Sequence, residues 1–165
     1  MACFINLLAI THSMRIISLA PSNTEILYAL ECSDEIVAVT RFCDYPEEAK
    51  LKPKVGGWID IDDKLVEKYM PDVIMTSTFV QDKIVSRFKE KGIKIFHSDP
   101  KTLEQVYESI ISIGEFVDKK EKALEIVAIV EDINNYTFSM SSTISLKTSI
   151  CLFIYVFRYK KKTKE

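Results

Sequence analysis

The stretch RIISLAPSNTEILYAL, residues 15–30, predicts the fold class of this chain. Residues 15–20 form a continuous apolar run rich in β-branched side chains, which is typical of a strand buried on both faces. A proline ends this run, and the next two residues, Ser22 and Asn23, are good N-cap residues for a helix. Glu25 has the position relative to Ser22 that a capping box requires. We therefore expect a buried strand that leads directly into a helix.

The alternation of strand and helix continues along the chain. Apolar runs predict further strands at residues 36–40, 73–76 and 93–97. Helical periodicity predicts helices at residues 62–69, 81–91, 102–116 and 119–134. Strands that alternate with helices are typical of βαβ units and a parallel sheet. We expect an α/β three-layer sandwich, in which helices cover both faces of a small, mostly parallel sheet.

The composition indicates one globular domain and excludes several classes of function. The chain has 165 residues, of which 47% are hydrophobic, so it is long enough for a core. Its formal net charge of -2 gives no basic field that would recruit nucleic acid or an anionic membrane. The 4 cysteines are widely separated, so we expect free thiols rather than a disulfide framework or a metal knuckle.

The two ends of the chain differ in composition from the rest. Residues 1–14 form a mildly apolar, leader-like segment without a basic n-region, and its apolar part is short for a signal peptide. We expect no competent export signal there, or a misplaced start codon. Residues 136–165 form an atypical tail that is first rich in Ser and Thr, then apolar, then basic. We expect this tail to be the out-of-frame end of a damaged gene, and a core strand with a solvated basic tail or an interfacial stub are the alternatives.

Two large aromatic side chains, Tyr45 and Trp58, lie on loops that follow predicted strands. Planar side chains in such loops contribute little to a core but form good walls for a flat ligand. The alternative for each is a surface ring that covers a hydrophobic edge. Gly56 and Gly57, next to the tryptophan, allow either the close approach of a ligand or a plain tight turn. This pattern favours a small-molecule binding lobe over an enzyme.

Four segments in this order, RIISLAPSNTEILYAL, EIVAVTRFCDYPEEA, PKVGGW and PDVIMTS, resemble the N-terminal lobe of class III periplasmic binding proteins. These proteins are the solute receptors of ABC importers for cobalamin, haem and ferric siderophores. The spacing from CDYP to VGGW is most similar to that of the cobalamin-binding branch. The resemblance covers residues 15–134 and implies two α/β lobes joined by a long rigid helix, with the ligand held between them.

The resemblance also divides the chain into parts. Residues 15–118 correspond to the N-terminal α/β ligand-binding lobe, and residues 119–135 correspond to the start of the inter-lobe helix. The second lobe has no counterpart in this sequence. We therefore expect a chain that is truncated to its first lobe or that works as half of a clamp.

The candidate ligand-binding residues come from the resemblance and from the predicted sheet. The resemblance places its loop aromatics on Tyr45 and Trp58, and it places the turn before the first helix at the ligand cleft. Amide groups at that helix start favour an acceptor or an anion, although Ser22 also serves as a plain cap. Residues that follow the third strand lie at the carboxyl end of the sheet, where open α/β sheets bind ligands. The full set is Pro21, Ser22, Asn23, Tyr45, Gly57, Trp58, Ser77 and Phe79.

The sequence departs from the resembled receptors at two places. Those receptors dock on their permease through an acidic residue on each lobe, and the alignment from Trp58 places the first-lobe residue at Lys64. The acidic residues near enough to substitute for it are Asp62, Asp63 and Glu67. The usual glycines after the first helix are replaced by residues 31–33, ECS, so this loop must avoid a left-handed C-cap or strain it.

We expect a solute-binding component of an ABC importer that is most similar to a cobalamin receptor. Its partners would be the permease and a small molecule, a corrinoid or a metal chelate, which is the transported ligand rather than a cofactor. The resemblance implies a location in the periplasm or at the cell surface, whereas a correct start codon would leave the chain in the cytoplasm.

Three alternatives stay open from the sequence. A ferric-siderophore or haem receptor usually has basic residues at the cleft, and Arg41 and Lys54 are suitably close. A non-functional truncated remnant is the second alternative. An α/β enzyme is disfavoured because LAPSNTEI contains neither glycine-rich phosphate-binding motif, and because Cys43 adjoins Asp44, which does not lower a thiol pKa.

Overall fold

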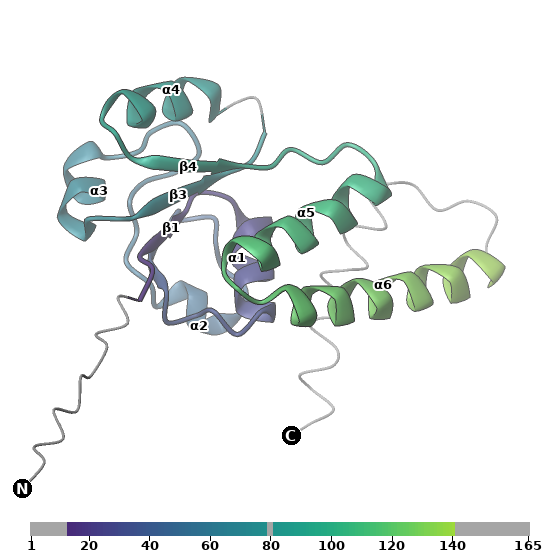
Figure 1. Cartoon of the computed structure of the whole chain (residues 1–165). Coiled ribbons are helices and arrows are strands. Elements are labelled where there is room, and N and C mark those ends of the chain that lie inside the picture. The colour runs from purple at the N-terminus through teal and green to yellow at the C-terminus, as the bar shows by residue number, and fades with distance from the viewer. Residues whose placement is uncertain (1–12, 79–80, 141–165) are drawn as a thin grey trace, which may run out of the picture.

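The computed structural model describes residues 13–78 and 81–140, with side chains up to residue 132. Most of the leader-like segment, Phe79 and the tail from residue 141 therefore lie outside the described residues. The described part begins just before the first strand and ends with a long helix (Figure 1).

Four short strands form one parallel sheet at the centre of the fold (Figure 1). They are β1 (Ile16–Ser18), β2 (Ile36–Val39), β3 (Val73–Thr76) and β4 (Lys94–His97). The strand order is β2-β1-β3-β4, and each neighbouring pair is parallel. The predicted parallel sheet is confirmed, and all strands end at the same edge.

The described residues contain six helices. They are α1 (Pro21–Ala29), α2 (Glu47–Lys50), α3 (Asp63–Tyr69), α4 (Asp82–Glu90), α5 (Leu103–Phe116) and α6 (Lys120–Met140). Periodicity does not predict α2, because a single turn is too short to show it. α6 continues to Met140, past the predicted end at residue 134, and so includes the first residues of the expected tail. In this part of the chain, none of the helices combines the length and apolar character that a membrane span needs.

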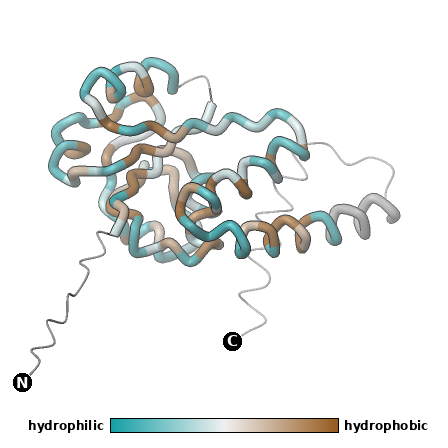
Figure 2. The backbone as a smooth tube through the Cα atoms, viewed as in Figure 1, coloured by the Kyte–Doolittle hydropathy of each residue, from teal (hydrophilic) through white to brown (hydrophobic). Residues whose placement is uncertain are grey.

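Helices cover both faces of the sheet, as the alternating pattern predicts (Figure 1). Successive side chains of a strand point to opposite faces, so Ile16 and Ile17 of β1 belong to different clusters. α1, α5 and α6 pack on the face of Ile16, and α3 and α4 pack on the face of Ile17. Figure 2 shows apolar residues gathered in the strands and alternating with polar ones along the helices. The three-layer α/β sandwich is therefore confirmed.

The start of α1 differs from the predicted capping box. The helix begins at Pro21, and Ala20 is the N-cap, without a side-chain hydrogen bond. Proline suits the first helical position because its missing N–H needs no partner there. Ser22 and Asn23 therefore lie inside the first turn, and Glu25 is buried. The capping-box prediction is wrong because the proline already starts the helix before Ser22.

The turn that ends α1 is left-handed without a glycine, which is the strained one of the two conformations that the sequence allows. Glu31 has a left-handed backbone with a φ of 62°, a conformation that glycine usually supplies. The amide of Cys32 donates to the carbonyl of Leu27 at 2.9 Å, so the helix ends in a closed turn. The Glu31 carboxylate lies 2.9 Å from Nζ of Lys122, which ties this loop to α6.

Two cysteines in the described residues, Cys32 and Cys43, are free and buried, as the sequence predicts for its thiols. Burial, with a smaller contribution from Glu35, raises the pKa of Cys32 to about 11. The Cys43 sulfur lies 3.2 Å from the hydroxyl groups of both Thr24 and Thr40. Both thiols therefore act as structural side chains.

The turn between α5 and α6 brings these two helices close together. A Cβ atom on Gly114 would lie 2.4 Å from Cβ of Ala123 and 3.1 Å from the carbonyl oxygen of Lys119. The amide of Lys119 in turn donates to the Gly114 carbonyl at 2.6 Å. The contact between the helices therefore requires glycine at position 114 for reasons of space.

We predict that Gly114→Ala lowers the free energy of unfolding by about 1–3 kcal/mol, because the added methyl group overpacks the contact between α5 and α6. Urea denaturation followed by circular dichroism measures this loss. Ala123→Gly removes the atom that the new methyl group meets, so the double variant should recover part of the stability that the single variants lose.

The matched control is Gly92→Ala, because the space around Gly92 is open and only its φ of 78° opposes a side chain. This change should cost about 1 kcal/mol, and Ala123→Gly should not reduce that cost. Simple additivity of Gly114→Ala and Ala123→Gly would contradict the packing explanation.

Candidate functional site

The carboxyl ends of the parallel strands meet at one edge of the sheet, the usual place for a ligand in an open α/β fold. We call the loops at this edge the rim. It consists of residues 19–23 after β1, residues 40–45 and 56–60 after β2, and residues 77, 78 and 81 after β3. The predicted ligand-binding residues that the structure describes all lie on these loops.

The start of α1 contributes one exposed side chain to the rim. Ser22 is exposed and Pro21 is half-buried. Asn23 is only 2% exposed, and its Nδ2 donates to the carbonyl of Thr76 at 3.1 Å. Asn23 therefore holds the start of α1 against the end of β3, and Ser22 is the side chain of this turn that a ligand can reach.

Trp58 and Phe42 form a pair of exposed rings at the rim. Their ring centroids are 6.0 Å apart and the ring planes make an angle of 69°, an edge-to-face contact. The exposed fractions are 46% for Trp58 and 49% for Phe42, so neither ring is part of the core. The Cζ atom of Arg41 lies 5.7 Å from the centroid of the Phe42 ring, which adds a cation–π contact.

Sequence reasoning identified Trp58 but missed Phe42. The available signal was an aromatic residue directly after a predicted strand, in the same loop as Tyr45. Tyr45 itself is half-buried, three positions further along that segment. The ring that the structure places against Trp58 is Phe42.

Two glycines shape the Trp58 loop. A Cβ atom on Gly56, whose φ is 134°, would lie 2.2 Å from the carbonyl oxygen of Asp60. A Cβ atom on Gly57 would lie 2.3 Å from Oδ1 of Asp60 and 2.5 Å from Nη2 of Arg41. Gly57 therefore provides the room in which the guanidinium of Arg41 meets the carboxylate of Asp60. For Gly56, the tight-turn explanation of the glycine is supported by its backbone contacts.

The loop after β3 is joined to the other two loops by a residue that the sequence did not indicate. Gln81 is 2% exposed, and its side chain bonds to the main chain at Leu19, Trp58 and Ser77. Ser77 is half-buried beside it. Finding Gln81 from sequence would require knowing which three loops meet at this point.

The predicted docking acids are engaged within the fold. Oδ1 of Asp62 accepts hydrogen bonds from the first amides of α3, at 2.9 Å and 3.2 Å. Asp63 lies 3.0 Å from Arg87 of α4 and 2.7 Å from Lys91, the residue after α4, and Glu67 lies 2.9 Å from Lys91. The charges of Asp63 and Glu67 are therefore largely balanced by these two cations.

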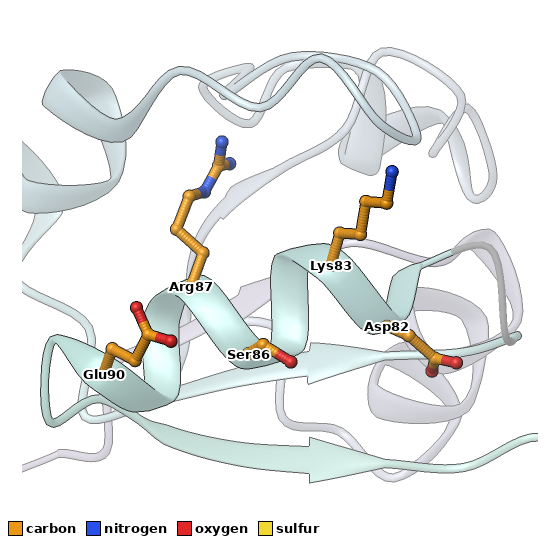
Figure 3. A pocket seen from close by; sticks show the side chains of 5 residues that line it. All are labelled: Asp82, Lys83, Ser86, Arg87 and Glu90. Carbon is orange, nitrogen blue, oxygen red and sulfur yellow. The ribbon is translucent and has the colours of Figure 1, made fainter.

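A surface depression of about 370 Å³ lies on α4. Its lining residues are Asp82, Lys83, Ser86, Arg87 and Glu90. In Figure 3, Lys83 and Arg87 point to the same side of the helix. Arg87 is already bound to Asp63 and to the carbonyl of Ile61, and the remaining charges have both signs. The depression is lined by no aromatic side chain, so the rim is the better candidate site for a flat ligand.

The described residues contain no group of three or more His, Cys, Asp or Glu side chains that could hold a metal ion. His97, at the end of β4, has Nδ1 2.8 Å from the hydroxyl oxygen of Thr76. This hydrogen bond links the ends of β3 and β4. The described rim side chains offer ring stacking and hydrogen bonding.

The sequence of this chain matches a known family of proteins. The sequence pattern of the periplasmic binding protein family matches residues 16–135, which include all the strands of the sheet. The chain therefore belongs to the periplasmic binding protein family, as the resemblance predicts.

Individual members of this family are similar to the chain in sequence or in structure. The chain is 32% identical over 111 residues to a vitamin B12-binding protein of Photorhabdus laumondii, with 67% of this chain and 40% of that protein aligned. A possible iron-binding, periplasmic solute-binding protein of Staphylococcus epidermidis has a similar structure, with a TM-score of 0.69, 29% identity, and coverage of 79% of this chain and 53% of that one. The periplasmic vitamin B12 binding protein BtuF of Vibrio cholerae gives a TM-score of 0.67 and 26% identity, over 76% of this chain and 51% of that one. The chain thus spans 40% of the length of the curated relative.

We predict that Arg41→Met raises the pKa of Asp60. The hydrogen bond from Arg41, followed by backbone hydrogen bonds, holds the pKa of this carboxyl below its usual value. Because the folded-state pKa is lowered, the pair stabilises the loop above the unfolded-state pKa, and this contribution is lost as the pH falls through the folded-state pKa. Carboxyl carbon NMR shifts recorded against pH measure the change.

Lys50→Met is the matched control, because Lys50 pairs with Glu47 outside the rim. It should leave the titration of Asp60 unchanged. An Asp60 carboxyl that titrates at the same pH in wild type and in Arg41→Met would show that the ion pair does not form in solution.

Proposed function

We propose that this chain is the ligand-binding lobe of a solute receptor of an ABC importer, and that its ligand is a corrinoid such as cobalamin. Membership of the periplasmic binding protein family and the vitamin B12-binding relative support the receptor role. The observation that carries the ligand proposal is the pair of half-exposed rings, Trp58 and Phe42, at the rim. Such a receptor captures its ligand outside the cytoplasm and does no chemistry on it.

The ring pair suits a broad, flat ligand. A corrin macrocycle has largely apolar faces, and planar side chains give it a large contact area at a small cost in side-chain entropy. The exposed surfaces of Trp58 and Phe42 lie where the loops after β2 form the rim. Ser22 adds an exposed hydroxyl on the neighbouring loop, which can bond to the polar edge of such a ligand.

The basic residues near the rim disfavour a ligand that presents carboxylates to it. Arg41 is paired with Asp60, and Nζ of Lys54 donates to the carbonyls of Cys43 and Ala49 at 3.3 Å and 2.9 Å. Burial lowers the pKa of Lys54. Haem carries propionates and many ferric siderophores are anionic, whereas the side chains of the corrin ring in cobalamin are amides. Arg41 and Lys54 are both bound to groups of the protein itself, and this supports a corrinoid as the ligand.

A metal chelate such as a ferric siderophore is the second candidate ligand. The possible iron-binding protein of Staphylococcus epidermidis, at 29% identity, favours this alternative. An anionic chelate at the rim would compete with Asp60 for Arg41, and this exposed pair opposes binding only weakly.

We propose an ABC permease as the protein partner. Of the predicted docking acids, Glu67 has the most suitable position, because 59% of its side chain is exposed despite the contact with Lys91. A permease arginine could share this carboxylate, since an exposed ion pair of this kind contributes only about 0–1 kcal/mol and is readily exchanged. Asp62 serves α3 as a cap, and Asp63 is held by two cations.

The rim contacts a ligand from one side. In a two-lobed receptor a second surface covers the other face, so a single lobe loses about half of the buried area and several kcal/mol of binding free energy. We therefore propose that the 165-residue chain, tested by itself, binds cobalamin only weakly.

Equilibrium dialysis of the purified chain against cyanocobalamin, haem and a ferric siderophore tests this proposal. We predict micromolar or weaker binding of cyanocobalamin, and weaker binding still of the two acidic ligands. Phe42→Ala should lower the affinity for cyanocobalamin by about tenfold, because it removes one of the two ring walls.

Leu51→Ala is the matched control, since Leu51 is also a large exposed apolar side chain, 86% exposed, but lies outside the rim. It should bind cyanocobalamin as the wild type does. Tighter binding of haem or siderophore than of cyanocobalamin would overturn the corrinoid proposal, and submicromolar binding by a monomer would overturn the argument from one exposed ligand face.

A further inference from the structure

We infer that Gln81 is a positioning residue of the rim, which fixes the Trp58 loop relative to the ends of β1 and β3. The inference rests on the proposed function only in that Trp58 is taken to contact the ligand. The arrangement of Gln81 itself is independent of the identity of that ligand.

The side chain of Gln81 connects three loops from a buried position. Its Nε2 donates to the carbonyl of Leu19 at 3.1 Å and to the carbonyl of Trp58 at 3.4 Å. Its Oε1 accepts from the amide of Ser77 at 2.8 Å. Only a side-chain amide offers two donors and an acceptor in one plane, so no other neutral residue of this size makes all three bonds.

The main chain beside Gln81 is strained, and Gln81 holds it in place. Thr78 has a φ of 75°, which is an outlier for a β-branched residue. The amide of Gln81 donates to the Thr78 carbonyl at 3.1 Å, while its side chain bonds to Ser77 on the other side. Backbone strain of this kind persists when surrounding contacts over-determine it, and it is common at ligand sites.

Within the described part of the chain, Gln81 supplies a hydrogen bond between the Trp58 loop and the centre of the sheet. On the β2 side, this loop is bound to Arg41, through the Gly56 carbonyl at 2.9 Å and through the Asp60 carboxylate. On the side of β1 and β3, it is bound through the Trp58 carbonyl to Gln81. Without the Gln81 amide, the Trp58 loop can move with the β2 loop and away from the other two loops.

The sequence contains a single tryptophan, Trp58. Its fluorescence therefore reports on this loop alone, and the measurement needs no ligand. In Gln81→Leu, which keeps the volume and removes all three bonds, acrylamide quenching of Trp58 should roughly double, and its anisotropy should fall. The affinity for cyanocobalamin should fall by about tenfold. Circular dichroism and urea denaturation establish that the variant is folded.

Gln81→Glu separates the contributions of the three bonds. The carboxylate keeps the acceptor for the Ser77 amide but has no donor for Leu19 or Trp58. It should therefore release Trp58 as Gln81→Leu does, while the main chain at Ser77 stays in place. This variant also serves if Gln81→Leu does not fold.

Ser109→Ala is the control for a general loss of stability. Ser109 is 8% exposed on α5, and its hydroxyl lies 2.6 Å from that of Ser98, away from the Trp58 loop. It should lower the urea midpoint without changing the quenching or anisotropy of Trp58. Unchanged Trp58 fluorescence in folded Gln81→Leu and Gln81→Glu would overturn the positioning role. Released Trp58 in a protein that binds no cyanocobalamin would instead contradict the proposed ligand and leave the role of Gln81 standing.

Discussion

The buried carboxyl ends of β1 and β3 impose the requirement on which the rim depends. The carbonyls at these ends need partners, because a buried carbonyl without a hydrogen bond costs about 1–3 kcal/mol. The carbonyl of Leu19, directly after β1, accepts from Gln81, and the carbonyl of Thr76, the last residue of β3, accepts from Asn23 and from the amide of Ser98. Asn23 and Gln81 stand at the beginnings of the helices that follow these strands. The same bonds therefore complete the sheet, fix the starts of α1 and α4, and bring the loops together.

The rim separates its apolar and charged groups in a way that suits its family. The two rings face solvent, whereas the guanidinium of Arg41 and the ammonium of Lys54 are bound to the protein. A surface of this kind selects a ligand by its shape and apolar area more than by its charge. The chain belongs to the periplasmic binding protein family. The distribution of charge at the rim supports our proposal that the ligand is a corrinoid.

The sequence predicts the layers of this fold better than its local contacts. Apolar runs and helical spacing depend on burial, which the whole fold enforces, so the parallel sheet and the helices on both faces are confirmed. The capping box failed because a proline at the first helical position overrides a cap further on. Phe42 and Gln81 were missed because their importance comes from neighbours distant in sequence, which no local pattern encodes.

The two outer layers of the sandwich differ in how much of their contact is ionic. Asp63 and Glu67 pair with Arg87 and Lys91, in addition to the apolar packing of α3 and α4 on the sheet. α5 and α6 meet mainly in apolar contact at Gly114, with one ion pair between Glu115 and Lys120. Dissolved salt screens exposed ion pairs but does not weaken apolar packing. A saltier medium therefore weakens more of the contacts between α3 and α4 than between α5 and α6, while the apolar contacts on both faces of the sheet remain.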